Sequence, residues 1–547
     1  MNQTLTSFSP RLREAMARLE RYRQGKRKLD ARLCDEAIWW QSRHAQSPAE
    51  GSSRRGRPVS AWLFNSICSK HADLCDRAPT CTALPREEGD QADAALLSAI
   101  LPVVAARCGL GQVYSDNAWS KLKHGTAVYG VFWNPTLENG IGDIDIRRVD
   151  VMNLFWEPGV RSIQESPHLY LVGLEDRAAL ESRYPALAEA ARQGKLCEDG
   201  LTGEGTTLLS NGGSYLFGER EGSPEKYTVV DWYYKVTLPS GKSLLHYAKF
   251  VGDVLLYASE NDPACAERGW YDHGQYPFVT DVLFPEEDSP AGYGLIAVGR
   301  NPQGYIDELD GHILEYANWA SRVRYWAKRS LGVNEREFLD PDRAIIQVEG
   351  DMDEEKLRQI TLSPMDGMLA EVRQRKIDEL KETTGTRDVN QGSTSGGVTA
   401  AAAITALQEA GNKGSRDCLA GCYRAYVSVM EQVVELIRQF YSGTRCFRIA
   451  GKDGLQYIRY TNRGLQDKEI GRDAGGQPLS RRPIFDIEVR AERETPLDRA
   501  GRNELMLSLF EAGMFDPDRR AAAEAALSGM DFDGIDSLRA RLRQGDA

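Results

Sequence analysis

The chain has 547 residues, more than one hydrophobic core usually organises, so we expect two to four domains. Its 41% hydrophobic and 27% charged residues are typical of a globular protein. A protein that grips nucleic acid by neutralising phosphates is normally basic on at least one face, but the formal net charge here is −12, so either nucleic acid is irrelevant or it passes by without being held. We find no run of eighteen apolar residues, no apolar core at the N-terminus and no CxxC pair among ten cysteines, so we expect no membrane span, no signal peptide and folding in a reducing cytoplasm.

The N-terminal region reads as helical. Residues 8–47 should form a helix with Ser9 as N-cap and Pro10 at its first position, followed by apolar residues at helical spacing: Leu12, Ala15, Met16 and Leu19. After a polar Gly/Ser/Arg link, two further helical patches are predicted near 60–77 and 90–107.

From Thr126 to Phe284 the pattern changes to that of strands. The segments are rich in β-branched and aromatic residues and are separated by turns: TAVYGVFWN, GDIDIRRVDV, HLYLVGL, KYTVVDWYYKVTL and LLHYAKFVGDVLLYA. The LPSGKSLL segment predicts a hairpin turn, and a Gly-rich excursion interrupts this region near 200–214.

The helical period then returns. An apolar stripe consists of Ile306, Leu309, Ile313, Ala317 and Ala320, with Asp307, Glu308 and Glu315 off that face. A mixed segment of about forty residues (324–363) contains the strand-like AIIQV, and a second helix should begin at Pro364.

A polar loop follows, and after it a long helix. The loop, GTRDVNQGSTSGG, spans 385–397. The helix from Val398 to Tyr441 is marked by a heptad seam at Leu419, Cys422, Tyr426, Val429, Val433, Leu436 and Phe440. Strands are predicted at 445–450 and 484–490, and short helices at the C-terminus, with starts at Thr495-Pro496 and Asp516-Pro517 and an end at Gly513.

No motif predicts catalysis, a cofactor or a metal. GKS at Gly241–Ser243 lacks the earlier glycine of a phosphate-binding loop, and Gly292, Gly294 and Ala297 match a dinucleotide fingerprint only loosely. The seven histidines show no ligand spacing, and Cys418 and Cys422, one helical turn apart, are interpreted as small core residues.

Four stretches together resemble the portal proteins of tailed double-stranded DNA bacteriophages: the segment starting KLKHGTAVYGVFWN, NPQGYIDELDGHILEYA, IDELKETTGTRDVNQG, and TSGGVTAAAAITALQEAGNKGSRDC with the helix after it. The resemblance covers most of residues 60–450. It implies an α+β portal fold, divided into a wing (1–300, β-rich at 125–290), stem helices (301–323 and 364–384), a small α/β clip (324–363), a tunnel loop (385–397), a second wing part with a long bent helix (398–495) and a helical crown (496–547).

The resemblance also implies partners and site residues. We expect a ring of about twelve copies at one capsid vertex of the virion, made in the host cytoplasm, with double-stranded DNA passing through its channel. The tunnel loop would face the DNA with Arg387, Asp388, Asn390, Gln391, Ser393, Thr394 and Ser395. The clip would dock the large terminase subunit and later a head-completion or tail adaptor protein, with Arg322, Arg324, Lys328, Arg329, Asp351, Asp353 and Glu354. Major capsid and scaffolding proteins would be further partners; no membrane, metal or cofactor is expected.

Two alternatives stay open at this stage. One is another ring-forming connector of the virion, although connectors are generally much smaller. The other is an enzyme that works beside a portal during packaging, which the missing phosphate-binding loop disfavours.

Overall fold

The computed structural model describes residues 2–42, 58–76, 79–193, 226–239, 241, 243–321, 325–327, 336, 357–359, 364–385, 413–451, 454–472, 478–491 and single positions from 508 to 524. The chain divides into two compact units. The larger contains residues 1–75 and 81–488, and the smaller contains residues 76–80 and 489–547. The account below concerns the larger unit.

A five-stranded antiparallel sheet carries the first helix on one face. The strands follow the order β4-β5-β6-β7-β8, with bounds Leu154–Phe155, His168–Asp176, Lys226–Thr237, Ser243–Val251 and Val254–Ala258. Alternation along β6 places Val230, Trp232 and Tyr234 on the face that packs against α1 (Asn2–Trp40). The predicted strands of this region and the β6–β7 hairpin are confirmed.

Helix α1 contributes Leu12, Ala15, Leu19 and Tyr22 to that core. Each buried side chain larger than alanine contributes about 1.5–3 kcal/mol when it leaves water. The predicted start at Ser9 is wrong, because the helix begins at Asn2 and Pro10 lies inside it. Proline inside a helix lacks the N–H that would bond one turn back, and its ring crowds the carbonyl group there, so the helix extends through Pro10 at the cost of both effects.

A second, three-stranded sheet has the order β3-β2-β9, with bounds Asp143–Val149, Thr126–Asn134 and Phe278–Val282. Helices α4 (Leu110–His124) and α13 (Lys413–Phe440) pack against it. The heptad seam of α13 is confirmed as its buried face, since Cys422, Tyr426, Val429, Val433 and Leu436 are all buried. Helix α4 was not predicted from the sequence.

Two further helices correspond to the predicted patches: α2 (Trp62–Cys75) and α3 (Gln91–Arg107). The segment Glu88–Arg107 has the length and mean hydropathy of a helix that could cross a membrane. Helix α3 packs against α4 and β14 (Arg445–Gly451), so burial within the protein accounts for part of this apolar character. Core helices of soluble proteins have the same composition.

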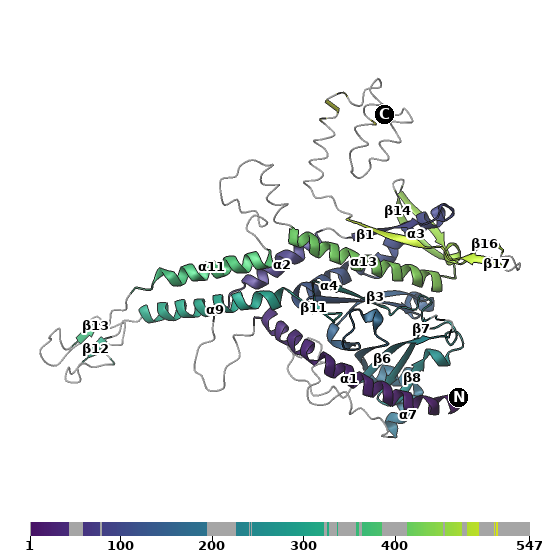
Figure 1. Cartoon of the computed structure of the whole chain (residues 1–547), viewed down its shortest axis with the longest axis horizontal. Coiled ribbons are helices and arrows are strands. Elements are labelled where there is room, and N and C mark those ends of the chain that lie inside the picture. Colours follow the sequence, from purple (N-terminus) through teal and green to yellow (C-terminus); the bar gives the residue numbers. More distant parts are fainter. Residues whose placement is uncertain are drawn as a thin grey trace. The chain divides into compact units, whose positions relative to one another are not determined.

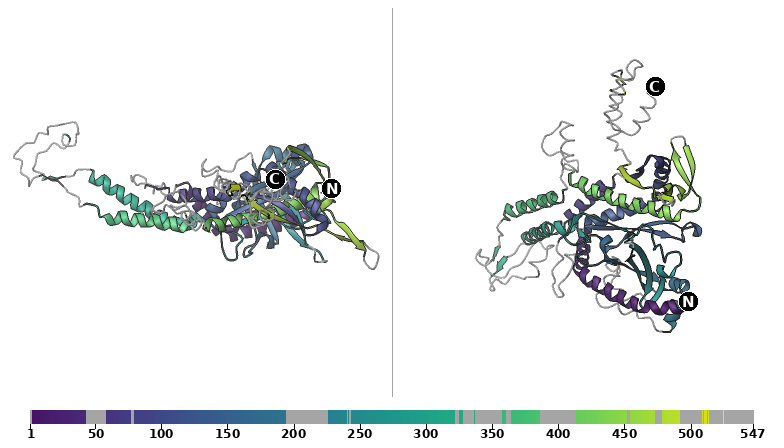
Figure 2. Two further views of the ribbon diagram at one scale, coloured as in Figure 1. Left: turned by 90° about the horizontal axis from the view of Figure 1, so that it is seen from above. Right: turned by 45° about the vertical axis from the view of Figure 1, so that its right-hand side comes forward.

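Helices α9 (Leu295–Ala320) and α11 (Gly367–Thr384) form a long hairpin (Figure 1). They pack along each other and lie side by side in both views of Figure 2. Arg373 of α11 pairs with Asp310 of α9. Helix α9 begins six residues before the predicted 301. Asp307, off the apolar stripe, is nevertheless buried, because its Oδ1 accepts hydrogen bonds from Ser60 and Gln303.

Between α9 and α11 in the sequence, two short strands pair with each other. β12 (Tyr325–Ala327) and β13 (Leu357–Gln359) pair antiparallel, with Trp326 opposite Arg358. They lie near the two ends of the predicted 324–363 excursion, whose AIIQV segment is outside the described residues. Because α9 and α11 are antiparallel, the two ends of the segment between them lie close together, and the antiparallel pairing of β12 with β13 fits this arrangement.

The remaining elements are short. The predicted strands at 445–450 and 484–490 are confirmed as β14 and β18 (Phe485–Ala491). The other elements are β1 (Pro79–Pro85), α5 (Leu137–Gly140), α6 (Arg177–Arg183), α7 (Pro185–Arg192), β10 (Phe284–Pro285), β11 (Gly292–Tyr293), β15 (Gly454–Tyr460), β16 (Lys468–Arg472), β17 (Pro478–Arg481) and seven-residue or shorter 3-10 turns between them. The predicted crown helices lie almost entirely outside the described residues.

Candidate functional site

The site residues predicted from the sequence all lie outside the described residues. This holds for the loop positions Arg387, Asp388, Asn390, Gln391, Ser393, Thr394 and Ser395, and for the docking positions Arg322, Arg324, Lys328, Arg329, Asp351, Asp353 and Glu354. The structure does describe what flanks the loop. Gly385 ends α11 in the left-handed conformation (φ 68°), as a helix-ending glycine commonly does.

One lysine of α2 lies beside both ends of the segment 386–412. Lys70 Nζ donates to Ser415 Oγ at 2.6 Å, and that hydroxyl donates to Asp73 Oδ2 at 2.8 Å. On the other side, a Cβ added to Gly385 would lie 3.3 Å from Lys70 Nζ. Burial lowers the pKa of Lys70, so this contact holds the ammonium in a partly desolvated place. Lys70 therefore brings the end of α11 and the start of α13 to one point.

A second lysine anchors α13 one turn further on. Lys121 of α4 is 1% exposed, and its Nζ lies 2.7 Å from Asp281 Oδ1 of β9 and donates to the Cys418 carbonyl oxygen at 3.0 Å. Gly421 permits this approach, since a Cβ there would lie 2.8 Å from Nζ. Burial disfavours the ammonium, but Asp281 and the two thiols raise the pKa of Lys121 overall, so it stays charged.

The cysteines beside Lys121 are core residues, as predicted. Cys418 and Cys422 are both buried, and Cys422 Sγ lies 3.3 Å from Lys121 Nζ. Within the described ranges, no three His, Cys, Asp or Glu side chains are grouped so that they could hold a metal ion. The thiols of Cys418 and Cys422 form part of the buried surroundings of the Lys121 ammonium.

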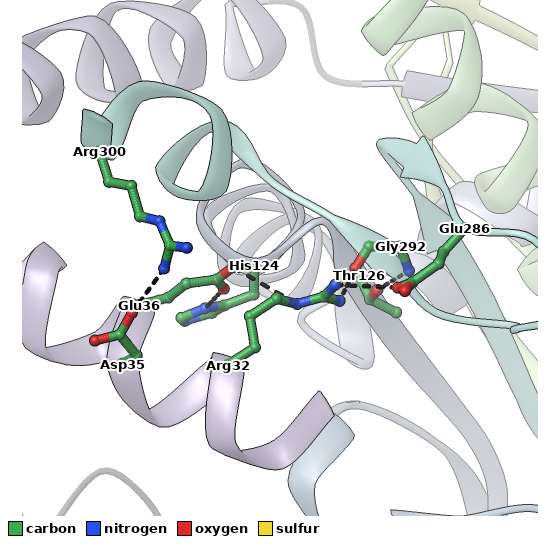
Figure 3. Close-up of polar contacts among 8 residues, drawn as sticks. All are labelled: Arg32, Asp35, Glu36, His124, Thr126, Glu286, Gly292 and Arg300. Atoms are coloured by element: carbon green, nitrogen blue, oxygen red, sulfur yellow. Dashed lines mark hydrogen bonds and ion pairs between the residues drawn. The ribbon is translucent and has the colours of Figure 1, made fainter. Parts of the chain in front are cut away.

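The same end of α4 is tied to α1 (Figure 3). His124 Nδ1 donates to Glu36 Oε2 at 2.8 Å, and Glu36 is fully buried. Next to it, Arg32 donates to the Gly292 carbonyl oxygen at 2.7 Å and to Glu286 at 3.0 Å. The N–H of Gly292 in turn donates to the Thr126 hydroxyl. One turn of α1 thus holds the end of α4 and the strand β11 that leads into α9.

The first turns of α9 are fixed by the same helix and by a close backbone crossing. Arg300 of α9 donates to Asp35 of α1 at 2.8 Å (Figure 3). Two glycines permit the crossing: a Cβ on Gly294 would lie 2.3 Å from the Lys123 carbonyl oxygen, and a Cβ on Gly125 (φ 78°) would lie 2.0 Å from the Tyr293 carbonyl carbon. Any larger residue would force the start of α9 away from α4.

These contacts define one site, which we call the α4 junction: Arg32, Asp35, Glu36, Lys70, Lys121, His124, Gly125, Asp281, Gly292, Gly294, Arg300, Gly385 and Ser415. Sequence reasoning missed it. The available signal was Lys121 within the apolar spacing of α4 (Leu110, Tyr114, Ala118, Leu122), followed by a helix-ending glycine.

The contacts of the α4 junction fix helices and strands against one another. Within the described part of the chain, His71 Nε2 lies 3.1 Å from Ser115 Oγ and 3.4 Å from Cys75 Sγ, and His246 Nδ1 lies 3.1 Å from Ser259 Oγ. Burial raises the pKa of Cys75 and lowers the pKa of His71, which favours the neutral thiol and neutral ring over a reactive thiolate pair.

A cavity of about 670 Å³ lies between the two sheets, and some of its lining residues make polar contacts with one another. Among its lining residues, Lys249 pairs with Glu175, and the Tyr247 hydroxyl donates to Asp231 at 2.6 Å. Burial raises the pKa of Asp231 despite Lys249 nearby. We assign no ligand to this cavity.

Comparison with known proteins identifies one family. Residues 309–547 match the family model described as phage P22-like portal protein. The matched range begins within α9 and contains α11, the segment 386–412 and α13 with the strands after it. No curated protein matches the chain. The match over residues 309–547 confirms the resemblance of the chain to the phage portal proteins.

Proposed function

We propose that the chain is the subunit of a portal ring, the channel through which a phage genome enters and leaves the capsid. The observation that carries the proposal is the order of elements inside the family match. A two-helix hairpin with an excursion between its helices is followed by the segment 386–412, whose flanking residues Gly385 and Ser415 both lie beside Lys70, and then by helix α13. In this assignment α9 and α11 are the stem, 324–363 the clip and 385–397 the tunnel loop.

The stem hairpin supports assembly with further copies. It exposes large apolar side chains along both helices: Tyr305, Leu314 and Trp319 of α9 and Met368 and Val372 of α11. A slender hairpin cannot bury such residues alone, whereas a neighbouring hairpin in a ring would cover them. A closed ring forms when one face of each subunit contacts a different face of the next around a rotation axis.

The α4 junction would set the direction of the stem and the base of the tunnel loop. It fixes the start of α9, the end of α11 and the start of α13 against α1, α2 and α4. Gly385, at one end of the proposed tunnel loop, lies beside Lys70, and the Gly/Ser-rich sequence of 385–397 is conformationally permissive, which suits a channel that must follow an irregular DNA surface.

Further partners come from the portal assignment. The clip would bind the large terminase subunit during packaging and then a head-completion or tail adaptor protein. The ring would sit in the virion at the capsid vertex, in contact with major capsid and scaffolding proteins. About twelve copies would each carry a net charge of −12, so the channel wall would mostly repel DNA and let it slide.

A stiffened tunnel loop tests the assignment. Replacing Gly392, Ser393, Ser395 and Gly396 by proline should leave assembled rings intact, but particles should package shortened genomes or lose DNA. The control is four prolines in the 200–214 segment, which lies outside the channel in this assignment. Full-length genomes at normal yield would mean that 385–397 does not face DNA.

A further inference from the structure

The charges of the chain are unevenly distributed, and α1 holds a concentrated group of positive charges. Between Arg11 and Lys28 the helix holds eight cationic residues and two anionic ones, a net charge of +6. The whole chain carries −12, so the remaining residues carry −18. A concentrated basic segment on an acidic protein needs an explanation beyond solubility, for which scattered charges of both signs would suffice.

Four of these cations form one stripe on the outer face of α1: Arg13, Arg21, Arg27 and Lys28, all exposed. At 100° per residue they fall within an arc of about 120°, away from Leu12 and Tyr22 on the sheet side. We call this set the basic stripe. Its length from Arg13 to Lys28 is roughly 22 Å at 1.5 Å per residue. Glu20 falls inside the same arc and pairs with Arg23, so the edge is predominantly but not purely basic.

The basic stripe is not neutralised by the part of the chain that the structure describes. There, Arg13, Arg27 and Lys28 take part in no ion pair, and Arg21 approaches Glu157 only at 3.9 Å, with both side chains exposed. By contrast Lys26, on the inner face, is buried against Asp30 and the carbonyl oxygens of Val151 and Met152. Lys26 therefore serves packing, whereas the four cations of the stripe have only the distant Glu157, beside Arg21, as a described acidic neighbour.

We propose that the basic stripe binds the phosphate backbone of double-stranded DNA. B-DNA carries about one negative charge per 1.7 Å of axis, so a 22 Å edge faces about thirteen phosphate charges. Exposed Arg and Lys side chains on one helix face can contact phosphates without reading bases, so the binding should be independent of sequence. The remaining residues carry a net charge of −18, which disfavours DNA binding over most of the chain and favours α1 as the contact. The inference uses the proposed function only to name DNA as the polyanion present.

The test is the salt dependence of binding to a labelled 30-base-pair duplex, measured by fluorescence anisotropy on the full-length protein. Four phosphate contacts predict a slope of about −3.6 in log affinity against log salt, equivalent to roughly 150-fold weaker binding at 200 mM than at 50 mM salt. The variant Arg13→Gln, Arg21→Gln, Arg27→Gln, Lys28→Gln should lose most of this slope, and Gln keeps the helix propensity. The double variant Arg27→Glu, Lys28→Glu should weaken binding more per substituted residue than the four-residue Gln variant, because each change reverses a charge instead of removing it.

The matched control is Arg448→Gln, Arg459→Gln on the β14–β15 hairpin, two exposed arginines with no ion pair among the described residues. It should leave the slope unchanged. An unchanged slope in the four-residue variant, with its melting temperature retained, overturns the proposal. Equal competition by poly-L-glutamate would also overturn it, in favour of an acidic protein surface. Ring formation is scored separately: intact wild-type rings that fail to bind DNA would contradict this inference alone, and DNA binding by wild-type protein that forms no rings would contradict the proposed function alone.

Discussion

Replacing Lys121 by methionine should loosen α4 and α13 together. The change removes a cation that is 1% exposed and leaves Asp281, 5% exposed, without its ion-pair partner. Breaking a buried pair in this way costs about 3–5 kcal/mol, because the remaining charge stays desolvated. Removing both members, as in Lys121→Met with Asp281→Leu, should restore most of the loss, since well-packed apolar replacements are often neutral.

Hydrogen exchange resolved by peptide is the suitable assay, because it reports opening of individual elements in a multi-unit chain. A loss of 3–5 kcal/mol predicts exchange roughly 10² to 5 × 10³ times faster in peptides of α4 and α13. The exposed pair Lys376–Glu379 on α11 provides the control, and Lys376→Met should change exchange less than fivefold.

The effect should also depend on pH. Burial raises the pKa of Asp281 above its ordinary value even with Lys121 present, and removing Lys121 raises it further. The folded variant then binds a proton more readily than the unfolded chain, so its deficit should shrink as pH falls from 8 to 5. Equal effects of Lys121→Met and Lys376→Met, or a double variant as unstable as the single one, would refute the role given to the buried pair.

Three further outcomes follow from the structure. Gly294→Ala should lower the melting temperature by several degrees or prevent folding, because its Cβ would meet the Lys123 carbonyl oxygen, whereas Gly111→Ala on α4, with open space around it, should be neutral or stabilising. Arg481 and Lys468 lower the pKa of Asp90 in the folded protein. The stability that these two contacts contribute should therefore be lost as pH falls from the ordinary Asp pKa of 3.8 through the lower pKa of the folded state. Asp90→Asn should remove this acid-dependent part of a denaturation curve. Leu314→Ser with Trp319→Ser should leave secondary structure unchanged by circular dichroism but reduce assembly measured by mass photometry; undiminished assembly would show that the outer stem face is not an interface.

Elements with strong periodicity were predictable. The strands between Thr126 and Ala258 alternate β-branched and aromatic residues, and the seam of α13 keeps a heptad spacing, so local pattern alone decides their type. Helix α4 was missed because its sequence, LGQVYSDNAWSKLKH, mixes polar residues into the buried face. Asn117 and Lys121 lie in the core there, against the usual rule that such residues face water.

The α4 junction itself could not be predicted. Lys121 and Cys418 are 297 residues apart in sequence, and His124 and Glu36 are 88 apart, so only the folded arrangement brings them together. The close crossing at Gly125 and Gly294 depends equally on two distant backbone segments. The resemblance to phage portal proteins, by contrast, was predictable from contiguous stretches, because the segments that carry it follow one another along the chain.

Class-averaged electron micrographs of the purified full-length protein test the central claim most directly. The portal assignment predicts closed rings with an open central channel, viewed along the axis as about twelve repeats of the 60.9 kDa chain, or roughly 730 kDa in total. Thirteen repeats would agree equally well with a ring-forming portal. Monomers alone at micromolar concentration under every salt condition tried, or assemblies without a central opening, would contradict it.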